Sequence, residues 1–132
     1  MLPNDTFYVK RQVEVCKSDV NGSLRVDVAI FKNQEMVAVF ECDGIQHFKN
    51  SFYVSDKLFE AAKKRDVDKQ ASLVEKNIPI VRIYQPDLWG GNGNPKKKVA
   101  IDFIKLMVSK IVDGTIEGNV HYHPGVALYD QK

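Results

Sequence analysis

Three carboxylates stand on two consecutive stretches that are expected to be strands, and together they could support metal-dependent chemistry. Asp27 lies in the first stretch; Glu41 and Asp43 end the second, two residues apart and so on one face of a strand. If the strands are neighbours, the three groups converge. Because like charges brought together disfavour ionisation, a shared Mg²⁺ or Mn²⁺ is their natural partner, and the backbone carbonyl of Cys42 could be a further oxygen ligand. Such a cation polarises a phosphodiester and activates water, so the pattern favours phosphodiester hydrolysis.

The same residues also have a purely structural interpretation, in which Asp27 faces solvent and Glu41-Cys42-Asp43 only ends a strand. A helix expected downstream weighs against it. At about 100° per residue, three polar side chains of this helix share an arc with apolar residues that should face the sheet: Asp66, Lys69 and Gln70 beside Phe59, Ala62 and Leu73. Polar groups on a core-facing stripe must be paired or must line a site.

Two interpretations of that stripe stay open. Lys69 could supply positive charge near a scissile phosphate, with Asp66 holding it or a neighbouring group. Alternatively, Asp66 and Lys69 form a buried pair one turn apart, or the register of the helix differs.

Gln46 and His47 follow the second strand directly, where side chains reach the rim of a site above the sheet. His47 could orient water, contact phosphate or complete a metal shell, although a lone histidine is usually a surface or packing residue. Cys42 fits a core position better than a nucleophile, because nothing in its surroundings is electropositive. His121 and His123 lack two further ligands nearby in sequence and are expected on the surface of a tail.

The elements needed to position these residues can be predicted from periodicity. β-branched, aromatic and alternating stretches predict strands at residues 6–16, 24–31, 36–42 and 78–84. Amphipathic patterns predict helices at residues 56–76 and 99–112. A regular aliphatic row at alternate positions of residues 24–30 places Asp27 on the opposite face of its strand. One α/β domain over residues 1–132 is expected, with a core from about residue 6 to 112 and a tail over residues 113–132.

Composition narrows the classes of function. The 132 residues are 44% hydrophobic and 27% charged, as in an ordinary globular protein, and no apolar run is long enough to predict a membrane span. Two cysteines make neither a disulfide framework nor a four-ligand zinc site, so a reducing cytoplasm is expected. The formal charge of +2 does not by itself indicate nucleic acid. Basic side chains do gather in two runs that could contact phosphates or be solvated surface: Lys63-Lys64-Arg65 and Lys96-Lys97-Lys98.

Four motifs occur in order within residues 24–84, close to half of the chain. They are Arg25-Val26-Asp27, Phe40-Glu41-Cys42-Asp43-Gly44-Ile45-Gln46-His47-Phe48, Arg65-Asp66 followed by Lys69, and Ile80-Val81-Arg82-Ile83-Tyr84. This series resembles the PD-(D/E)xK nuclease superfamily, in particular its very-short-patch-repair-like endonuclease branch with phage and large-virus relatives. The resemblance implies a restriction-endonuclease-like fold, a central mixed β-sheet flanked by helices, in which Asp27 and Glu41 hold Mg²⁺.

The chain departs from the family pattern two residues after the glutamate, where Asp43 replaces the usual lysine. The resemblance therefore assigns that lysine's role to Lys69, His47 or Gln46. Three further residues are expected to support the site: Asp66, Gln70 and Arg82.

The expected function is that of a Mg²⁺-dependent endodeoxyribonuclease, with DNA favoured over RNA by the resemblance alone. The alternative is a catalytically inactive nucleic-acid-binding module of the same fold, for which the missing lysine argues. A structural or interaction protein is a third class. A duplex cutter of this size would form a homodimer to reach both strands, and no membrane partner is expected. If the chain is viral, its compartment would be the host cytoplasm or nucleus.

Overall fold

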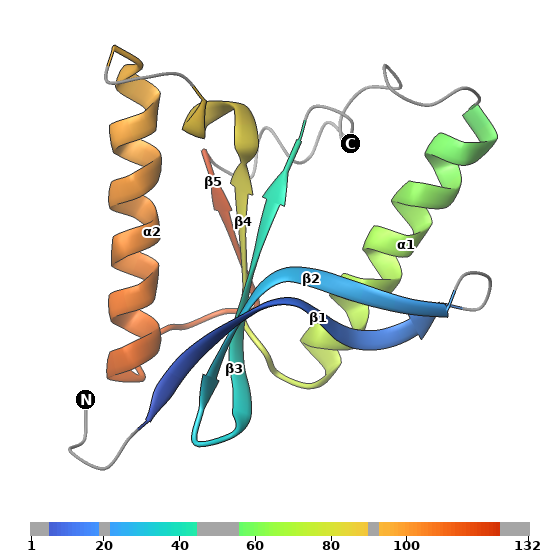
Figure 1. Ribbon diagram of the computed structural model, residues 1–132, viewed down its shortest axis with the longest axis horizontal. Coiled ribbons are helices and arrows are strands. Elements are labelled where there is room, and N and C mark those ends of the chain that lie inside the picture. The colour runs from blue at the N-terminus through green and yellow to red at the C-terminus, as the bar shows by residue number, and fades with distance from the viewer. Residues whose placement is uncertain (1–5, 19–21, 45–55, 90–92, 125–132) are drawn as a thin grey trace.

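The computed structural model describes residues 6–18, 22–44, 56–89 and 93–124. These residues form a five-stranded sheet with one long helix on each side (Figure 1). The strands are β1 (Phe7–Ser18), β2 (Gly22–Lys32), β3 (Glu35–Asp43), β4 (Ile80–Tyr84) and β5 (Val120–His123), and the helices are α1 (Asp56–Glu75) and α2 (Pro95–Asp113). A short 3-10 helix, η2 (Gln85–Leu88), follows β4. The predicted class, α/β with a central mixed sheet flanked by helices, is confirmed.

The sheet follows the order β1-β2-β3-β4-β5 and changes strand direction part of the way across. β1, β2 and β3 pair antiparallel, whereas β3, β4 and β5 pair parallel. The turn between β2 and β3 places Asn33 and Gln34 at φ 50° and 78°, the left-handed conformations that a two-residue hairpin turn requires. The parallel strands are joined through α1 and α2, so their carboxyl ends meet at one edge of the sheet (Figure 1).

Each face of the sheet has its own core. On the α2 side, Met107 and Ile111 pack against a cluster from β2, β3 and β4: Ile30, Ala38, Phe40, Val81 and Ile83. On the α1 side, Leu73 packs against a second cluster: Val15, Val26, Ala29, Val39 and Ile80. Because both faces are covered, β4 is apolar at almost every position, as central parallel strands are.

β2 does not keep a single aliphatic face, contrary to the alternation expected over residues 24–30. Val28 packs on the α2 side, whereas Val26 belongs to the cluster on the α1 side. The change occurs where β2 leaves β3, because their pairing reaches only Val28↔Phe40 while β2 continues with β1 as far as Gly22. Asp27 lies at this point of separation.

The segment expected to be a C-terminal tail contributes a strand. β5 pairs parallel with β4, with His123 opposite Ile83. His123 is buried, so its predicted surface position is wrong. A four-residue strand is too short for a readable alternation, and its stability depends on the neighbouring strand.

α2 begins four residues earlier than the predicted helix. Asn94 is its N-cap, accepting a hydrogen bond from the Lys96 backbone N–H, and Pro95 occupies the first turn. The helix ends at Gly114, which is left-handed at φ 72°. None of the described helices is both long and apolar enough to cross a membrane.

Candidate functional site

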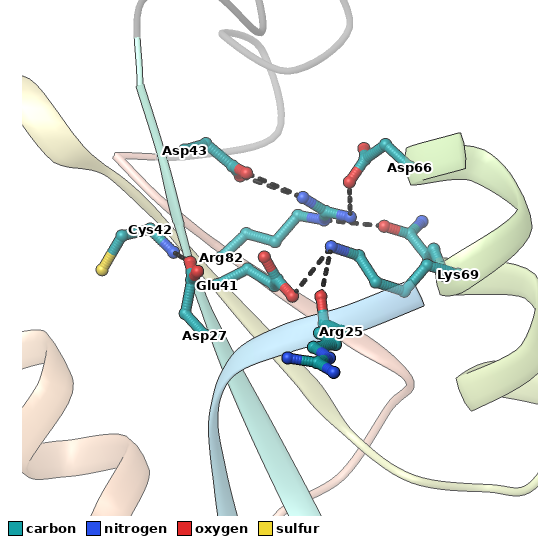
Figure 2. Close-up of polar contacts among 9 residues, drawn as sticks. Arg25, Asp27, Glu41, Cys42, Asp43, Asp66, Lys69 and Arg82 are labelled. Atoms are coloured by element: carbon teal, nitrogen blue, oxygen red, sulfur yellow. Dashed lines mark hydrogen bonds and ion pairs between the residues drawn. The ribbon is translucent and has the colours of Figure 1, made fainter. Parts of the chain in front are cut away.

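Polar side chains from β2, β3, β4 and α1 meet on the α1 side of the sheet (Figure 2). The β2–β3 pairing ends at Val28↔Phe40, and Asp27 on β2 and Glu41 on β3 are the residues next to that last pair on their two strands. They are close enough for the charge of Asp27 to affect the ionisation of Glu41. The structure therefore brings together two of the three carboxylates that were expected to converge.

Asp27 holds the point at which β2 and β3 separate. Its Oδ2 accepts a 2.8 Å hydrogen bond from the backbone N–H of Cys42. The carboxylate thus takes the place of the main-chain acceptor that this N–H would otherwise need. In a strand, the N–H and C=O of one residue point to the same neighbour, so the Cys42 carbonyl faces the side that β2 has left.

Glu41 is almost fully buried, at 4% exposure, and lies beside the ammonium group of Lys69. Lys69 Nζ is 3.1 Å from Glu41 Oε1 and also donates a 3.0 Å hydrogen bond to the carbonyl of Arg25 (Figure 2). Among the described residues, however, none donates a hydrogen bond of good geometry to Oε1. Lys69 therefore offsets part of the charge of Glu41, and its contact with the carboxylate lowers the pKa of Glu41 without returning it to the usual range.

The surroundings of Glu41 disfavour its charged form. Burial raises the pKa of Glu41 to about 7, and the nearby Asp27 carboxylate also raises it. Lys69 and Arg82 act in the opposite direction but do not offset burial. A second cation beside Glu41 and Asp27 would remove the conflict between them.

We expect the wild-type protein to lose stability relative to a Glu41→Gln variant as the pH rises from about 4.5 to about 7. The folded-state pKa is raised, so the contribution of Glu41 to stability is complete below the lower value and is lost as the pH passes the higher one. The free energy of unfolding of the wild type should fall by roughly 3 kcal/mol relative to the variant. Urea unfolding in EDTA across this pH range measures the difference.

Glu35→Gln is the matched control, since Glu35 is exposed at the start of the same strand. Its stability should follow that of the wild type at each pH. Parallel stability curves for wild type and Glu41→Gln would show that Glu41 is not held in a disfavoured ionisation state.

Arg82 on β4 ties the adjoining part of the site together. It is 1% exposed, and its guanidinium donates to both oxygens of Asp43 at 2.9 and 3.1 Å and to Asp66 Oδ1 at 2.9 Å. Its Nε donates to Gln70 Oε1 at 2.7 Å. Burial alone would lower the pKa of Arg82, but Asp43 and Asp66 raise it above its usual value. These hydrogen bonds of Arg82 join α1 to β3 and β4 next to Glu41.

These contacts decide how the polar stripe of α1 is used. Asp66 on α1 pairs with Arg82 on β4, and Lys69 one turn along the helix pairs with Glu41. Asp43 is fully buried with both carboxylate oxygens on Arg82. The geometry therefore favours a positioning role for Asp43 over the direct part in chemistry that its spacing suggested.

The Cys42 side chain has no nucleophilic character in this setting. Burial raises the pKa of its thiol, and Asp27, Asp43 and Glu41 raise it further. Cys42 contacts the site through its backbone N–H, which donates to Asp27, and the role of its carbonyl as a metal ligand stays a prediction.

The remaining predicted residues lie away from this cluster or outside the described residues. Gln46 and His47 fall outside them. The basic runs lie on different helices: Lys63, Lys64 and Arg65 on α1, and Lys96, Lys97 and Lys98 at the start of α2. The two helices flank opposite faces of the sheet (Figure 1).

The donor set suits a hard cation. Asp27, Glu41 and the Cys42 carbonyl offer oxygen ligands, which Mg²⁺ and Mn²⁺ prefer. Within the described part of the chain, no group of three or more His, Cys, Asp and Glu side chains is arranged to hold a metal ion. Two carboxylates and one main-chain carbonyl leave several coordination positions open, so water and substrate oxygens would have to supply them.

Sequence reasoning missed a second polar group, formed by Asp87 of η2 and His123 of β5. Both are buried, and His123 Nε2 lies 3.8 Å from Asp87 Oδ2. The only sequence signal for their pairing is that each lies near the end of a strand. Parallel pairing of β4 and β5 brings those ends together.

No protein-family model, curated protein or solved structure matches the chain.

Proposed function

We propose that this protein is a metal-dependent endonuclease that hydrolyses phosphodiester bonds in DNA. The observation that carries the proposal is the pair of carboxylates at the separation of β2 and β3. Glu41 is buried beside Asp27 with a carboxylate oxygen that receives no well-formed hydrogen bond from the described residues, and its pKa is raised to about 7. Such a pair is poorly accommodated by the protein alone and well accommodated around a divalent cation.

Asp27, Glu41 and the Cys42 carbonyl are the groups that would hold the metal. When bound, Mg²⁺ or Mn²⁺ would polarise the phosphodiester and lower the pKa of a coordinated water. The hydrogen bond from the Cys42 N–H to Asp27 fixes one carboxylate relative to β3. This prior ordering reduces the reorganisation needed when the groups act together.

Lys69 is the candidate for the role of the family's lysine. Its ammonium is 3.1 Å from Glu41 and donates a hydrogen bond to the Arg25 carbonyl. In this chain the positive charge beside the carboxylates therefore comes from α1, whereas the family's usual lysine lies on the strand that corresponds to β3. There it would stabilise negative charge that develops on a phosphate oxygen. The Arg82 network positions α1, and therefore Lys69, relative to the sheet.

The proposal includes a restriction-endonuclease-like arrangement of the sheet and helices. Its support is the coincidence of the motif series with neighbouring positions in the fold: Asp27 and Glu41 on adjacent strands, with Lys69 on the helix that follows. DNA is favoured over RNA by the resemblance. Cutting both strands of a duplex would require a second copy of the chain.

The basic runs are the candidates for phosphate contacts. Lys63, whose side chain is 33% exposed, is 3.7 Å from the exposed Glu60, and the exposed Lys64 is 3.0 Å from Asp68, both along α1. Exposed pairs of this kind contribute little to stability, so a phosphate could replace the carboxylate at small cost.

A second candidate function is an inactive nucleic-acid-binding module of the same fold. One observation favours it: Asp43 stands where the family usually has lysine, and both its oxygens are engaged by Arg82. Such a module would bind nucleic acid without cutting it.

Cleavage of a mixed panel of labelled single-stranded, duplex and branched DNA and RNA tests the proposal. Mg²⁺ or Mn²⁺ should support cutting of at least one DNA substrate. EDTA should abolish cutting, because the proposed reaction depends on the metal ion as its Lewis acid. The readout is the appearance of shorter labelled products on a denaturing gel.

A readout independent of the substrate accompanies the panel. A cation held by Asp27 and Glu41 should raise the melting temperature of the wild type, because it binds only the folded chain. Folded protein that neither cuts any substrate nor gains stability from Mg²⁺ or Mn²⁺ would contradict the proposal. Binding without cutting would favour the second candidate.

A further inference from the structure

A cavity of about 410 Å³ is lined by residues of η2, the start of α2 and the end of β5. Its lining includes Tyr84, Asp87, Pro95, Lys96, Val99 and His123. This volume is in the range of roughly 300–1,000 Å³ typical of small-ligand pockets. The surface of the walls is mostly apolar, and a carboxylate, an imidazole, a phenol and an ammonium group also line it, so the cavity suits a ligand with a large apolar face and a few polar groups.

The acidic wall of the cavity is formed by Asp87, whose side chain is buried. Asp87 is 6% exposed, and His123 Nε2 stands 3.8 Å from its Oδ2, too far for a hydrogen bond. The His123 ring is fixed from behind by Phe103, with ring centroids 5.1 Å apart. A buried carboxylate held beside the cavity in this way can accept hydrogen bonds from a ligand that presents N–H donors.

The basic wall comes from a side chain and not from helix N–H groups. The backbone N–H of Lys96 is already bonded to the Asn94 side chain, and that of Lys97 to the Asn94 carbonyl. The exposed Lys96 ammonium therefore supplies the charge for an anionic group, and the N-terminal end of the α2 dipole adds to it. The cavity thus has a hydrogen-bond acceptor on one wall and a cation on another.

The cavity and the candidate active site both lie near the carboxyl ends of the parallel strands, but on opposite sides of the sheet, because the start of α2 lines the cavity and the carboxylates lie on the α1 side. Tyr84, which lines it, is the register partner of Asp43 in the β3–β4 ladder. Neighbouring strands are only about 4.8 Å apart, so the pocket begins one strand away from the end of the carboxylate-bearing strand. Ligand sites at the carboxyl ends of parallel strands are common in α/β folds.

We propose that this cavity binds one unpaired nucleotide, its base against Asp87 and Tyr84 and its phosphate at Lys96. The inference rests on the proposed function, because it takes the nucleotide to be part of the nucleic-acid strand that the protein cuts. A carboxylate is an acceptor only, so bases with an amino group are favoured. Guanine presents two adjacent N–H donors to it and should bind best, whereas thymine, with carbonyls on both sides of its single N–H, should bind worst.

Isothermal titration calorimetry in EDTA tests the pocket separately from catalysis. The wild-type protein is titrated with the four deoxynucleoside monophosphates, with deoxyguanosine, with inorganic phosphate, and with a single-stranded thymidine oligonucleotide that carries one guanine. We expect saturable binding with dGMP tightest and dTMP weakest. If the oligonucleotide binds more tightly than dGMP, the pocket's natural ligand is part of a strand; the reverse order assigns it to a free nucleotide.

Two variants locate the contacts. Asp87→Asn should weaken dGMP binding about tenfold or more and reduce the preference over dTMP, because it removes the charged acceptor. Lys96→Met should weaken dGMP binding by a similar factor while leaving deoxyguanosine unaffected. The matched controls are Asp102→Asn and Lys105→Met, which change exposed residues farther along α2 and should bind like the wild type.

Several outcomes would overturn the pocket assignment. They are a lack of nucleotide binding by folded wild type, equal binding by Asp87→Asn, and binding of phosphate with no contribution from the base. Because no metal is present, a failure of cleavage leaves these measurements unchanged. Metal-dependent cleavage without nucleotide binding would reject the pocket and leave the proposed function standing.

Discussion

Replacing Arg82 with methionine is expected to lower the free energy of unfolding by about 3–5 kcal/mol, the usual cost of breaking a buried ion pair by removing one partner. Arg82 is 1% exposed and is shared by Asp43 and Asp66. Methionine fills much of the same volume, so the loss comes from two carboxylates left in the interior without their cation. Urea unfolding followed by circular dichroism measures the effect, which is a large fraction of the roughly 5–15 kcal/mol that stabilises a typical domain.

Two comparisons separate this cause from loss of packing. Arg11→Met changes an exposed arginine on β1 and should alter stability by no more than about 0.5 kcal/mol. The triple variant Arg82→Met, Asp43→Asn, Asp66→Asn removes the stranded charges and should recover part of the loss. If Arg82→Met costs no more than Arg11→Met, the network contributes nothing to stability, and its proposed part in positioning Lys69 loses its basis.

The position of the polar stripe on α1 could be predicted from sequence, but its pairing could not. A helical period places Asp66, Lys69 and Gln70 toward the sheet whatever the partners are. Partner choice depends on what the sheet presents there. Arg82 has a planar fork that reaches Asp43, Asp66 and Gln70 together, whereas an Asp66–Lys69 pair one turn apart would use only one such contact.

The role of Asp27 shows a second limit of periodicity. Alternation correctly indicated that Asp27 differs from its aliphatic neighbours, but it predicted a continuous face across a strand that changes partners in the middle. Separation of β2 from β3 leaves the Cys42 N–H for the Asp27 side chain to bind. The separation coincides with the packing of Val26 in the cluster under α1, and such packing is a tertiary property that alternation in one strand does not contain.

The pairing of Asp87 with His123 could not be predicted from the sequence, for a related reason. Its two residues are 36 positions apart by their numbers, and β5 is too short to be recognised by pattern. Strand order decides their meeting, since β5 adds to β4 and not to β1. The sequence therefore predicted the class of the fold and the main carboxylate cluster, and it could not predict the cavity built at the edge of the sheet.

Under the proposed function, Glu41 would cost stability whenever no cation is bound beside it. A buried carboxylate with its pKa raised to about 7 is less favourable in the folded chain than a neutral amide would be at neutral pH. Positions that oppose stability in this way are characteristic of functional sites. Activity and stability should consequently change in opposite directions when the charge is removed.

Glu41→Gln is therefore expected to lower metal-dependent cleavage about 10³-fold or more. A metal ion contributes several kcal/mol to stabilising a phosphoryl transition state, and each 1.36 kcal/mol corresponds to a tenfold change in rate. Glutamine keeps the size of the side chain but has no negative charge to hold the cation. Single-turnover cleavage of the best panel substrate, at saturating protein and in Mg²⁺, measures the rate of the chemical step.

Stability measured on the same samples separates loss of the site from loss of the fold. Above about pH 7 and without metal, Glu41→Gln should be more stable than the wild type, whereas Glu35→Gln should match the wild type in both cleavage and stability. An inactive variant that is also destabilised would assign Glu41 to the core. An active one would remove it from the site and move the proposal to a different set of ligands, because Asp27 alone cannot supply the paired carboxylates on which the chemistry depends.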